Sequence, residues 1–135
     1  MATFTRFEDI EGWKKARQLT REVYRLSNGG AMSRDFGLRD QMRRASVSVM
    51  ANIAEGFGRG GNKEFISFLS IARGSCAEVK SHAFVALDAG LLNEADARQI
   101  QDLASESEAL VSGLIKYLAA SDARGRKFAS ANREP

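Results

Sequence analysis

The apolar residues of this chain recur every three or four positions in successive segments, which is the spacing of amphipathic helices. The first stripe comprises Ala16, Leu19, Val23 and Leu26. A later segment keeps a heptad register through Phe65, Leu69, Ala72, Cys76, Val79, Ala83 and Ala86. The last stripe comprises Ile100, Leu103, Ser107, Leu110, Leu114 and Tyr117. Each stripe is typical of the inward face of a helix in an antiparallel bundle.

The segment from Gln41 to Glu64 differs from these three because it is apolar on two sides. At about 100° per residue, one stripe contains Leu38, Met42, Ala45, Val49, Asn52 and Gly56. A second patch, well round the helix, contains Val47, Met50, Ala54 and Phe57. A helix that is apolar on two sides must be covered on two sides. We therefore expect the second patch to contact a partner and the protein to assemble as a homo-oligomer.

Capping residues and glycines divide the chain into four helices. The predicted N-caps are Asp9, Asp35, Asn62 and Asn93. Glycines after each of the first three helices mark where these helices end. The sequence thus predicts an all-α fold, an antiparallel up-down-up-down four-helix bundle in residues 1–121. Residues 122–135 are polar and basic, and we expect them to form a disordered tail.

The composition fits one compact domain. The chain has 135 residues, of which 44% are hydrophobic and 27% charged, with a single proline. It has no run of roughly 18 apolar residues, so we expect no membrane partner. The N-terminus lacks the basic and apolar regions of a secretory signal, and the single cysteine excludes an internal disulfide. These features predict a cytoplasmic protein.

The sequence contains no recognisable catalytic or metal-binding constellation. A structural zinc site needs about four Cys and His ligands, whereas this chain has one of each, Cys76 and His82. No nucleophile accompanies His82, and Cys76 lies on an apolar stripe, which indicates a core residue. The run GFGRGG follows a predicted helix and lacks the GK[ST] ending of a phosphate-binding loop, so a helix terminator is the better interpretation. We expect no enzyme activity and no cofactor.

Charge is distributed unevenly along the chain. The net charge is +3, but residues 1–62 carry eleven Lys and Arg against seven Asp and Glu, and residues 63–121 carry five against eight. The basic side chains of the first half fall into two sets. The first set is a stripe on the first helix, formed by Lys14, Arg17, Arg21 and Arg25. The second set comprises Arg43, Arg44, Arg59 and Lys63. Both are candidates for contacting the phosphates of RNA or DNA.

Each basic set also has a purely structural interpretation. The first stripe has the composition of a solvated helix face. The arginines of the second set, together with Asn52, Glu55 and Glu78, fit a hydrogen-bond and salt-bridge network that fixes bundle register or subunit contacts. Base-stacking aromatic residues are not interleaved with the second set, although single-strand binding requires them.

Three consecutive motifs resemble one known family. FEDIEGWKKA, GLRDQMRRASVSVMANIAEGFGR and KEFISFLSIARGSCAEV are similar to the 23S rRNA intervening-sequence (S23-like) four-helix-bundle proteins. The resemblance extends over roughly residues 7–118, and that family includes accessory proteins of diversity-generating retroelements. The family's marked positions correspond here to Gln41, Arg43, Arg44, Asn52, Glu55, Gly56, Arg59, Gly74, Ser75 and Glu78.

This resemblance implies a ring-shaped homopentamer without enzymatic activity. For the retroelement members it further implies a basic surface that binds nucleic acid and a reverse transcriptase as partner. Two hypotheses follow for this chain. In the first, the oligomer binds RNA or DNA through the two basic sets. In the second, it is a protein–protein interaction scaffold whose arginines lie in subunit contacts. An enzyme using Glu55, Glu78 and His82 is a more distant third.

Overall fold

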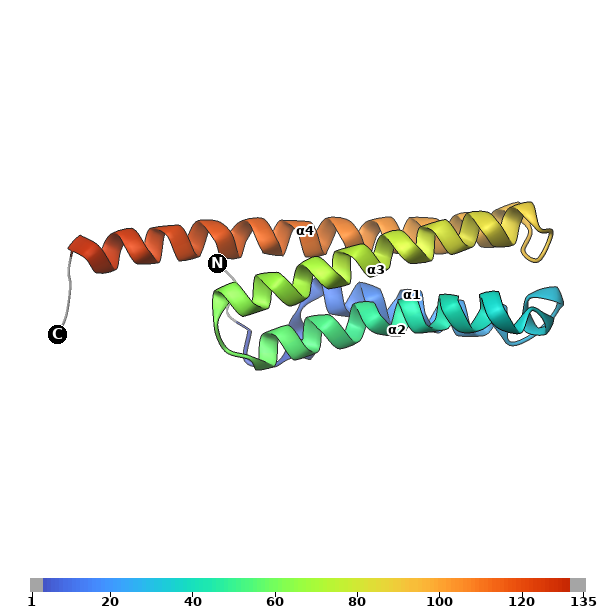
Figure 1. Ribbon diagram of the computed structural model, residues 1–135, viewed down its shortest axis with the longest axis horizontal. Coiled ribbons are helices and arrows are strands. Elements are labelled where there is room, and N and C mark those ends of the chain that lie inside the picture. The colour runs from blue at the N-terminus through green and yellow to red at the C-terminus, as the bar shows by residue number, and fades with distance from the viewer. Residues whose placement is uncertain (1–3, 132–135) are drawn as a thin grey trace.

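The protein is a bundle of four long helices (Figure 1). The computed structural model describes the backbone of residues 4–131 and the side chains of residues 4–121, and no strand occurs within them. The long helices are α1 (Glu11–Ser27), α2 (Phe36–Gly58), α3 (Asn62–Asp88) and α4 (Glu94–Ala131). Two short 3₁₀ segments precede α1 and α2, namely η1 (Phe7–Asp9) and η2 (Ala31–Arg34). The prediction of an all-α fold is confirmed.

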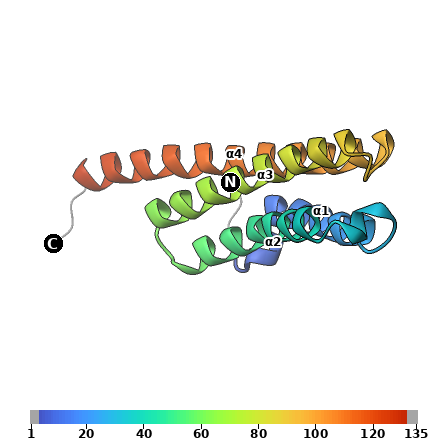
Figure 2. The same ribbon diagram turned by 45° about the vertical axis from the view of Figure 1, so that its right-hand side comes forward.

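Each long helix packs antiparallel against the next, and α4 returns to pack against α1 (Figures 1 and 2). The α1–α2 and α3–α4 connections lie at one end of the bundle, and the α2–α3 turn lies at the other. This is the up-down-up-down arrangement that the four stripes predict.

Two of the four predicted caps form. The Asp35 side chain accepts a hydrogen bond from the Leu38 amide at 3.1 Å, and Asn93 Oδ1 accepts one from the Asp96 amide at 2.8 Å. The predictions at Asp9 and Asn62 are wrong. Asp9 lies in η1, and α1 begins after an extended Ile10 that is only 2% exposed. Burial of the Ile10 side chain, rather than a polar cap, therefore sets the start of α1.

At the start of α3 the chain leaves a tight turn one residue earlier than predicted. Gly61 is the N-cap residue in an extended conformation, so Asn62 is already the first helical residue. Gly60 in the same turn has φ +88°, a conformation that favours glycine. The glycine-rich run therefore terminates α2 and opens α3, as the sequence indicates.

The core consists of two apolar clusters stacked along the bundle axis. One contains Leu19, Met42, Val79 and Ile100 and lies towards the α3–α4 connection, and the other contains Ile10, Val49, Ile53, Leu69 and Val111. All seven residues of the predicted α3 stripe are buried, with at most 7% of each side chain exposed. Helix α3 thus contributes to both clusters and joins them into one core.

The second apolar side of α2 is mostly covered within the chain itself. Met50 and Phe57 are half-buried and pack against the second cluster, to which the N-terminal arm also contributes Phe4 and Phe7. Segment η1 contacts α2 directly. Of the predicted outward patch, Val47 is exposed, at 42%, and Ala54 is half-buried. Met50 and Phe57 therefore find apolar contacts within the chain, and Val47 is the member of the predicted patch that is left exposed.

Helix α4 continues to Ala131, ten residues beyond the predicted boundary at residue 121. Alanines recur through this region, and the first proline is Pro135, so local propensity favours continuation of the helix. The last part of α4 projects past the rest of the bundle (Figure 1). The prediction of a disordered tail thus does not hold for the backbone of residues 122–131, and residues 132–135 lie outside those described.

Helices α2 and α3 approach closely near their connecting turn. The Gly56 backbone is so near α3 that an added Cβ would lie 2.7 Å from Phe68 Cβ and 3.0 Å from Phe65 Cδ1. Both distances are below or at the limit for real carbon contacts. Glycine is thus required here by space and not by backbone conformation.

Replacing Gly56 by alanine should destabilise the bundle by about 1–3 kcal/mol, the usual cost of overpacking a core. Urea denaturation followed by circular dichroism measures the change. Gly113→Ala is the matched control, because an added Cβ at this exposed position of α4 meets nothing within 4 Å. The control should gain about 0.5–1 kcal/mol from helix propensity. Equal stability of the two variants would refute the close approach.

Candidate functional site

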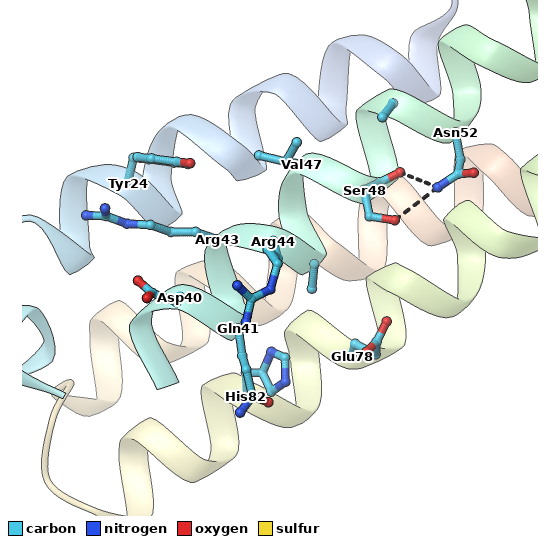
Figure 3. A pocket seen from close by; sticks show the side chains of 12 residues that line it. Tyr24, Asp40, Gln41, Arg43, Arg44, Val47, Ser48, Asn52, Glu78 and His82 are labelled. Carbon is cyan, nitrogen blue, oxygen red and sulfur yellow. Dashed lines mark hydrogen bonds between the residues drawn. The ribbon is translucent and has the colours of Figure 1, made fainter. Parts of the chain in front are cut away.

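An open groove of about 810 Å³ runs along the outer surface of α2 and α3 (Figure 3). We call it the α2–α3 groove. It is lined by Gln41, Arg44, Val47, Ser48, Ala51 and Asn52 of α2, among others, by Glu78 and His82 of α3, and by Tyr24 of α1. The small side chains of α2 leave the space, and the longer polar side chains surround it.

A hydrogen-bonded cluster at the groove links the two helices. Asn52 Nδ2 donates to the Ser48 carbonyl oxygen at 2.9 Å and to Ser48 Oγ at 3.0 Å. Ser48 Oγ also hydrogen-bonds with Ser75 Oγ of α3 at 2.9 Å. The half-buried Asn52 amide thus finds partners, as a buried amide must. The cluster fixes the position of α2 relative to α3 along their shared axis.

His82 is a half-buried histidine of the groove without a hydrogen bond on Nδ1 from the side chains and backbone described. Burial lowers its pKa below the ordinary value of 6.5, and the nearby Glu78 carboxylate opposes this shift. Figure 3 shows Gln41 and Arg44 of α2 extending towards His82. The lowered pKa favours the neutral imidazole, which faces polar neighbours from the other helix.

Exposed apolar side chains border the groove on α3. Ile71 and Val85 are 52% and 49% exposed and lie seven residues on either side of the exposed Glu78. Residues seven apart return to nearly the same direction on a helix, so these three form one outward stripe. Ile71 and Val85 on α3 and Val47 on α2 therefore place apolar surface on both sides of the polar groove. This outward stripe could not be predicted from the inward heptad register of α3, which contains none of its residues.

The predicted basic stripe of α1 is exposed, but its members differ in their contacts. Lys14 pairs with Glu11 at 3.1 Å, and Arg25 makes a two-pronged contact with Glu22 at 2.6 and 2.8 Å. Hydrogen bonding to Glu22 raises the pKa of Arg25 above its ordinary value. Within the part of the chain whose side chains are described, Arg17 and Arg21 have no ion pair.

The second basic set is not one cluster. Arg43 and Arg59 are sixteen residues apart on α2, about 24 Å along the helix axis. Arg43 is half-buried and donates from Nε to Ser27 Oγ at 2.8 Å, whereas Arg59 pairs with Glu55 at 2.8 Å. Of the remaining members, Arg44 is exposed at the groove and Lys63 is exposed in the first turn of α3.

Aromatic rings accompany Arg43 and Arg59 of the second set, contrary to the sequence-based expectation, and also Arg17 of the first set, to which that expectation did not apply. The Arg43 guanidinium lies 4.5 Å from the ring centre of Tyr24, and that of Arg17 lies 5.7 Å from the ring centre of Trp13. The Trp13–Arg17 pair has the i, i+4 spacing that brings side chains together on a helix, so this signal was available. Tyr24 and Arg43 come from different helices, so their contact depends on the register of α1 against α2 and cannot be predicted from spacing along the sequence.

The other candidate residues for a subunit contact or a network are distributed over several sites. Asn52 belongs to the cluster with Ser48 and Ser75, and Glu55 pairs with Arg59. Glu78 lines the α2–α3 groove and makes no ion pair with the side chains described. Cys76 is fully buried, and its burial raises the pKa of the thiol to about 12, as expected of a core residue.

Two kinds of feature are missing from the part of the chain that the structure describes. No three His, Cys, Asp or Glu side chains gather there in a way that could hold a metal ion. None of its helices combines the length and the apolar character needed to cross a membrane.

The fold and the site together define the class: a four-helix-bundle protein with an open polar groove and with arginines on the outer face of α1. Comparison with known proteins gives the family. Residues 8–113 match the family model of the 23S rRNA-intervening sequence proteins, and the chain belongs to that family. A crystal structure of a protein of unknown function from the S23 ribosomal protein family of Bacteroides thetaiotaomicron VPI-5482 has the same fold. The TM-score is 0.70 at 20% identity, over 78% of this chain and 98% of that one. Comparison with curated protein sequences gives no match.

The depressed pKa of His82 predicts a loss of stability in acid. Above pH 6.5 the imidazole is neutral in both the folded and the unfolded protein, so it contributes no pH dependence. As the pH falls through 6.5, the unfolded chain takes up a proton that the folded protein still excludes, and unfolding becomes easier. Urea midpoints at pH 7.5 and 5.5 should therefore fall more for the wild type than for His82→Gln. Equal falls would show that His82 is not responsible.

Proposed function

We propose that this protein is a non-enzymatic homo-oligomer that binds RNA or DNA through the outer face of α1. The observation that carries the proposal is the pair Arg17 and Arg21, which are exposed and have no ion pair among the side chains described. Neither has an acidic residue three or four positions away, and they are themselves four apart. Like charges at this spacing destabilise a helix, so the arrangement favours an anionic ligand.

The chemistry of these arginines suits phosphate. A guanidinium group presents several donors in a plane and binds phosphate oxygens in pairs. The acidic residues of α1 at positions 11 and 22 are already engaged by Lys14 and Arg25. The excess of acidic residues lies in residues 63–121, which form α3 and most of α4. A phosphate backbone is thus attracted to the exposed arginines of α1 more than to the surfaces of α3 and α4.

Self-association is the second part of the proposal. The α2–α3 groove and the exposed Val47, Ile71 and Val85 provide apolar and polar surface for another copy of the chain. We expect a pentamer, and in a retroelement setting a reverse transcriptase as partner, from the resemblance to S23-like proteins. A cytoplasmic location completes the proposal, in keeping with the unpaired, buried Cys76.

The absence of an enzyme activity is also proposed, on the placement of three titratable groups. Glu78 and His82 line the α2–α3 groove, but Glu55 does not and instead pairs with Arg59. The three residues that an enzyme of this sequence would use do not share one site.

A scaffold without a nucleic-acid role is the second candidate, because Arg44 and Glu78 lie in the groove from opposite helices without ion pairs of their own within the described side chains. Each could pair with its counterpart in another copy. In that case Arg44→Ala would change the oligomer mass, and the charge of α1 would be irrelevant.

The double variant Arg17→Gln/Arg21→Gln should bind RNA and duplex DNA about tenfold more weakly at low salt, because two phosphate contacts are lost. Fluorescence anisotropy of labelled nucleic acid, repeated over a salt series, measures both affinity and slope. The slope of log K against log salt should decrease by roughly one for each arginine removed.

Arg73→Gln/Arg98→Gln is the matched control, since it removes the same charge from exposed positions on α3 and α4. It should bind as the wild type does. Wild-type protein that does not bind at low salt, or whose binding does not weaken as salt rises, would contradict the proposal and favour the scaffold.

Val85→Glu should reduce the oligomer to smaller species, because it places a charge in the apolar border of the groove. Light scattering coupled to size-exclusion chromatography at micromolar concentration measures the mass. Leu110→Glu is the control, an equally drastic change at a 39% exposed position on α4. It should leave the mass unchanged. A wild-type protein that is itself monomeric would refute self-association.

A further inference from the structure

The outer face of α1, which the proposed function assigns to nucleic acid as a whole, contains a hollow of about 320 Å³. It is lined by Glu8, Trp13, Lys14, Arg17, Gln18 and Arg21. Its volume is at the low end of the roughly 300–1,000 Å³ typical of small-ligand sites. It shares no lining residue with the α2–α3 groove, so self-association through that groove leaves these side chains available.

The wall of the hollow consists of two planar groups. The indole ring of Trp13 is half-buried and is held by Phe7, whose ring meets it edge-on at 5.2 Å between centres. The Arg17 guanidinium lies 5.7 Å from the indole centre. A ring packed against the core cannot turn away freely, so it presents a fixed surface. Aromatic rings and guanidinium planes are the two surfaces on which proteins stack unpaired bases.

The polar groups around this wall match the other parts of a nucleotide. The exposed Lys14 and Arg21 lie one residue and about two helical turns from Trp13, where they can reach phosphates on either side of a stacked base. Lys14 would do so in exchange for its exposed ion pair with Glu11. The Glu8 carboxylate accepts a hydrogen bond from Arg6 through Oε2 at 3.2 Å, and its other oxygen can accept one from a base edge. The Gln18 amide accepts from Lys15 at 3.4 Å and can also donate. Cation, aromatic plane and base-edge acceptor thus occur together in one hollow.

We propose that this hollow binds one unstacked base of a single-stranded nucleic acid, with Trp13 and Arg17 as the stacking surface and Lys14 and Arg21 at the flanking phosphates. The inference rests on the proposed function, and it adds a preference for single strands. In a duplex each base is stacked between its neighbours and cannot enter a hollow in the protein. Duplex would therefore contact the arginines but not the indole.

The chain contains only one tryptophan, so its intrinsic fluorescence reports this hollow alone. The wild-type protein is titrated at low salt with a single-stranded oligonucleotide, with the same sequence as a duplex, and with a nucleoside monophosphate. Anisotropy of the labelled oligonucleotide is followed in parallel and reports binding anywhere on the protein. Single strand should quench the fluorescence with the same midpoint as the anisotropy change, and duplex should bind without comparable quenching.

The two readouts separate the possible failures. Anisotropy without quenching by single strand would overturn the stacking inference and leave nucleic-acid binding intact, whereas no anisotropy change would overturn both. Equal quenching by single strand and duplex would also overturn it. A nucleoside monophosphate that quenches at the concentration of the oligonucleotide would overturn the single-strand proposal and indicate a mononucleotide site.

Two variants test the contact independently of the fluorescence. Trp13→Leu should weaken single-strand binding about tenfold, the usual effect of losing one base–aromatic stack, and change duplex binding little. Trp13→Phe keeps a ring that packs on Phe7 and should stay within about threefold of the wild type. Circular dichroism checks that both fold. Wild-type affinity of a folded Trp13→Leu for single strand would refute the inference.

Discussion

The close contact between α2 and α3 is the constraint on which the rest of the molecule depends. Near the connecting turn Gly56 leaves no room for a Cβ against Phe68, and further along Ser48 and Ser75 hydrogen-bond directly across the interface. The first contact requires a glycine on α2 opposite the large Phe68 of α3, and the second is made by small residues on both helices. Small side chains of α2, among them Ser48 and Ala51, also line the outer surface beside this contact and leave the space of the α2–α3 groove open.

The inward pattern of α3 could be predicted from the sequence because it depends on one helix at a time, whereas on α4 the predicted inward residue Leu110 is 39% exposed. The α3 stripe is buried throughout, since a heptad register decides which residues face a core wherever the neighbours lie. What the sequence analysis missed depends on two elements at once. The N-terminal arm joins the same apolar cluster as Met50 and Phe57, and the register of α1 against α2 places Arg43 on Tyr24. Neither follows from periodicity.

The difference between features that depend on one helix and features that depend on two also explains which candidate site residues lie together. Sequence proximity suggested a single basic cluster on α2, but a helix separates residues along its axis as well as round it, and Arg59 lies far from Arg43. Pairing within a turn then engages some charges, such as Arg59 with Glu55, and leaves others available. The number of arginines in a sequence therefore says little about a phosphate site. What matters is which of them lack an acidic neighbour one turn away.

The two surfaces of this bundle support each other if both are used. One α1 face offers one aromatic ring and two arginines without ion pairs among the described side chains, and the net charge of the chain is only +3, so as a polyanion site this face would be weak. Assembly through the α2–α3 groove would repeat the outer face of α1 around a ring. It would leave that face uncovered, because the groove and the hollow on α1 share no lining residue. Each further copy then binds at a high effective concentration once the first has bound, so affinity rises without any stronger contact. A modest site on a small subunit is thus sufficient, provided that the subunit assembles.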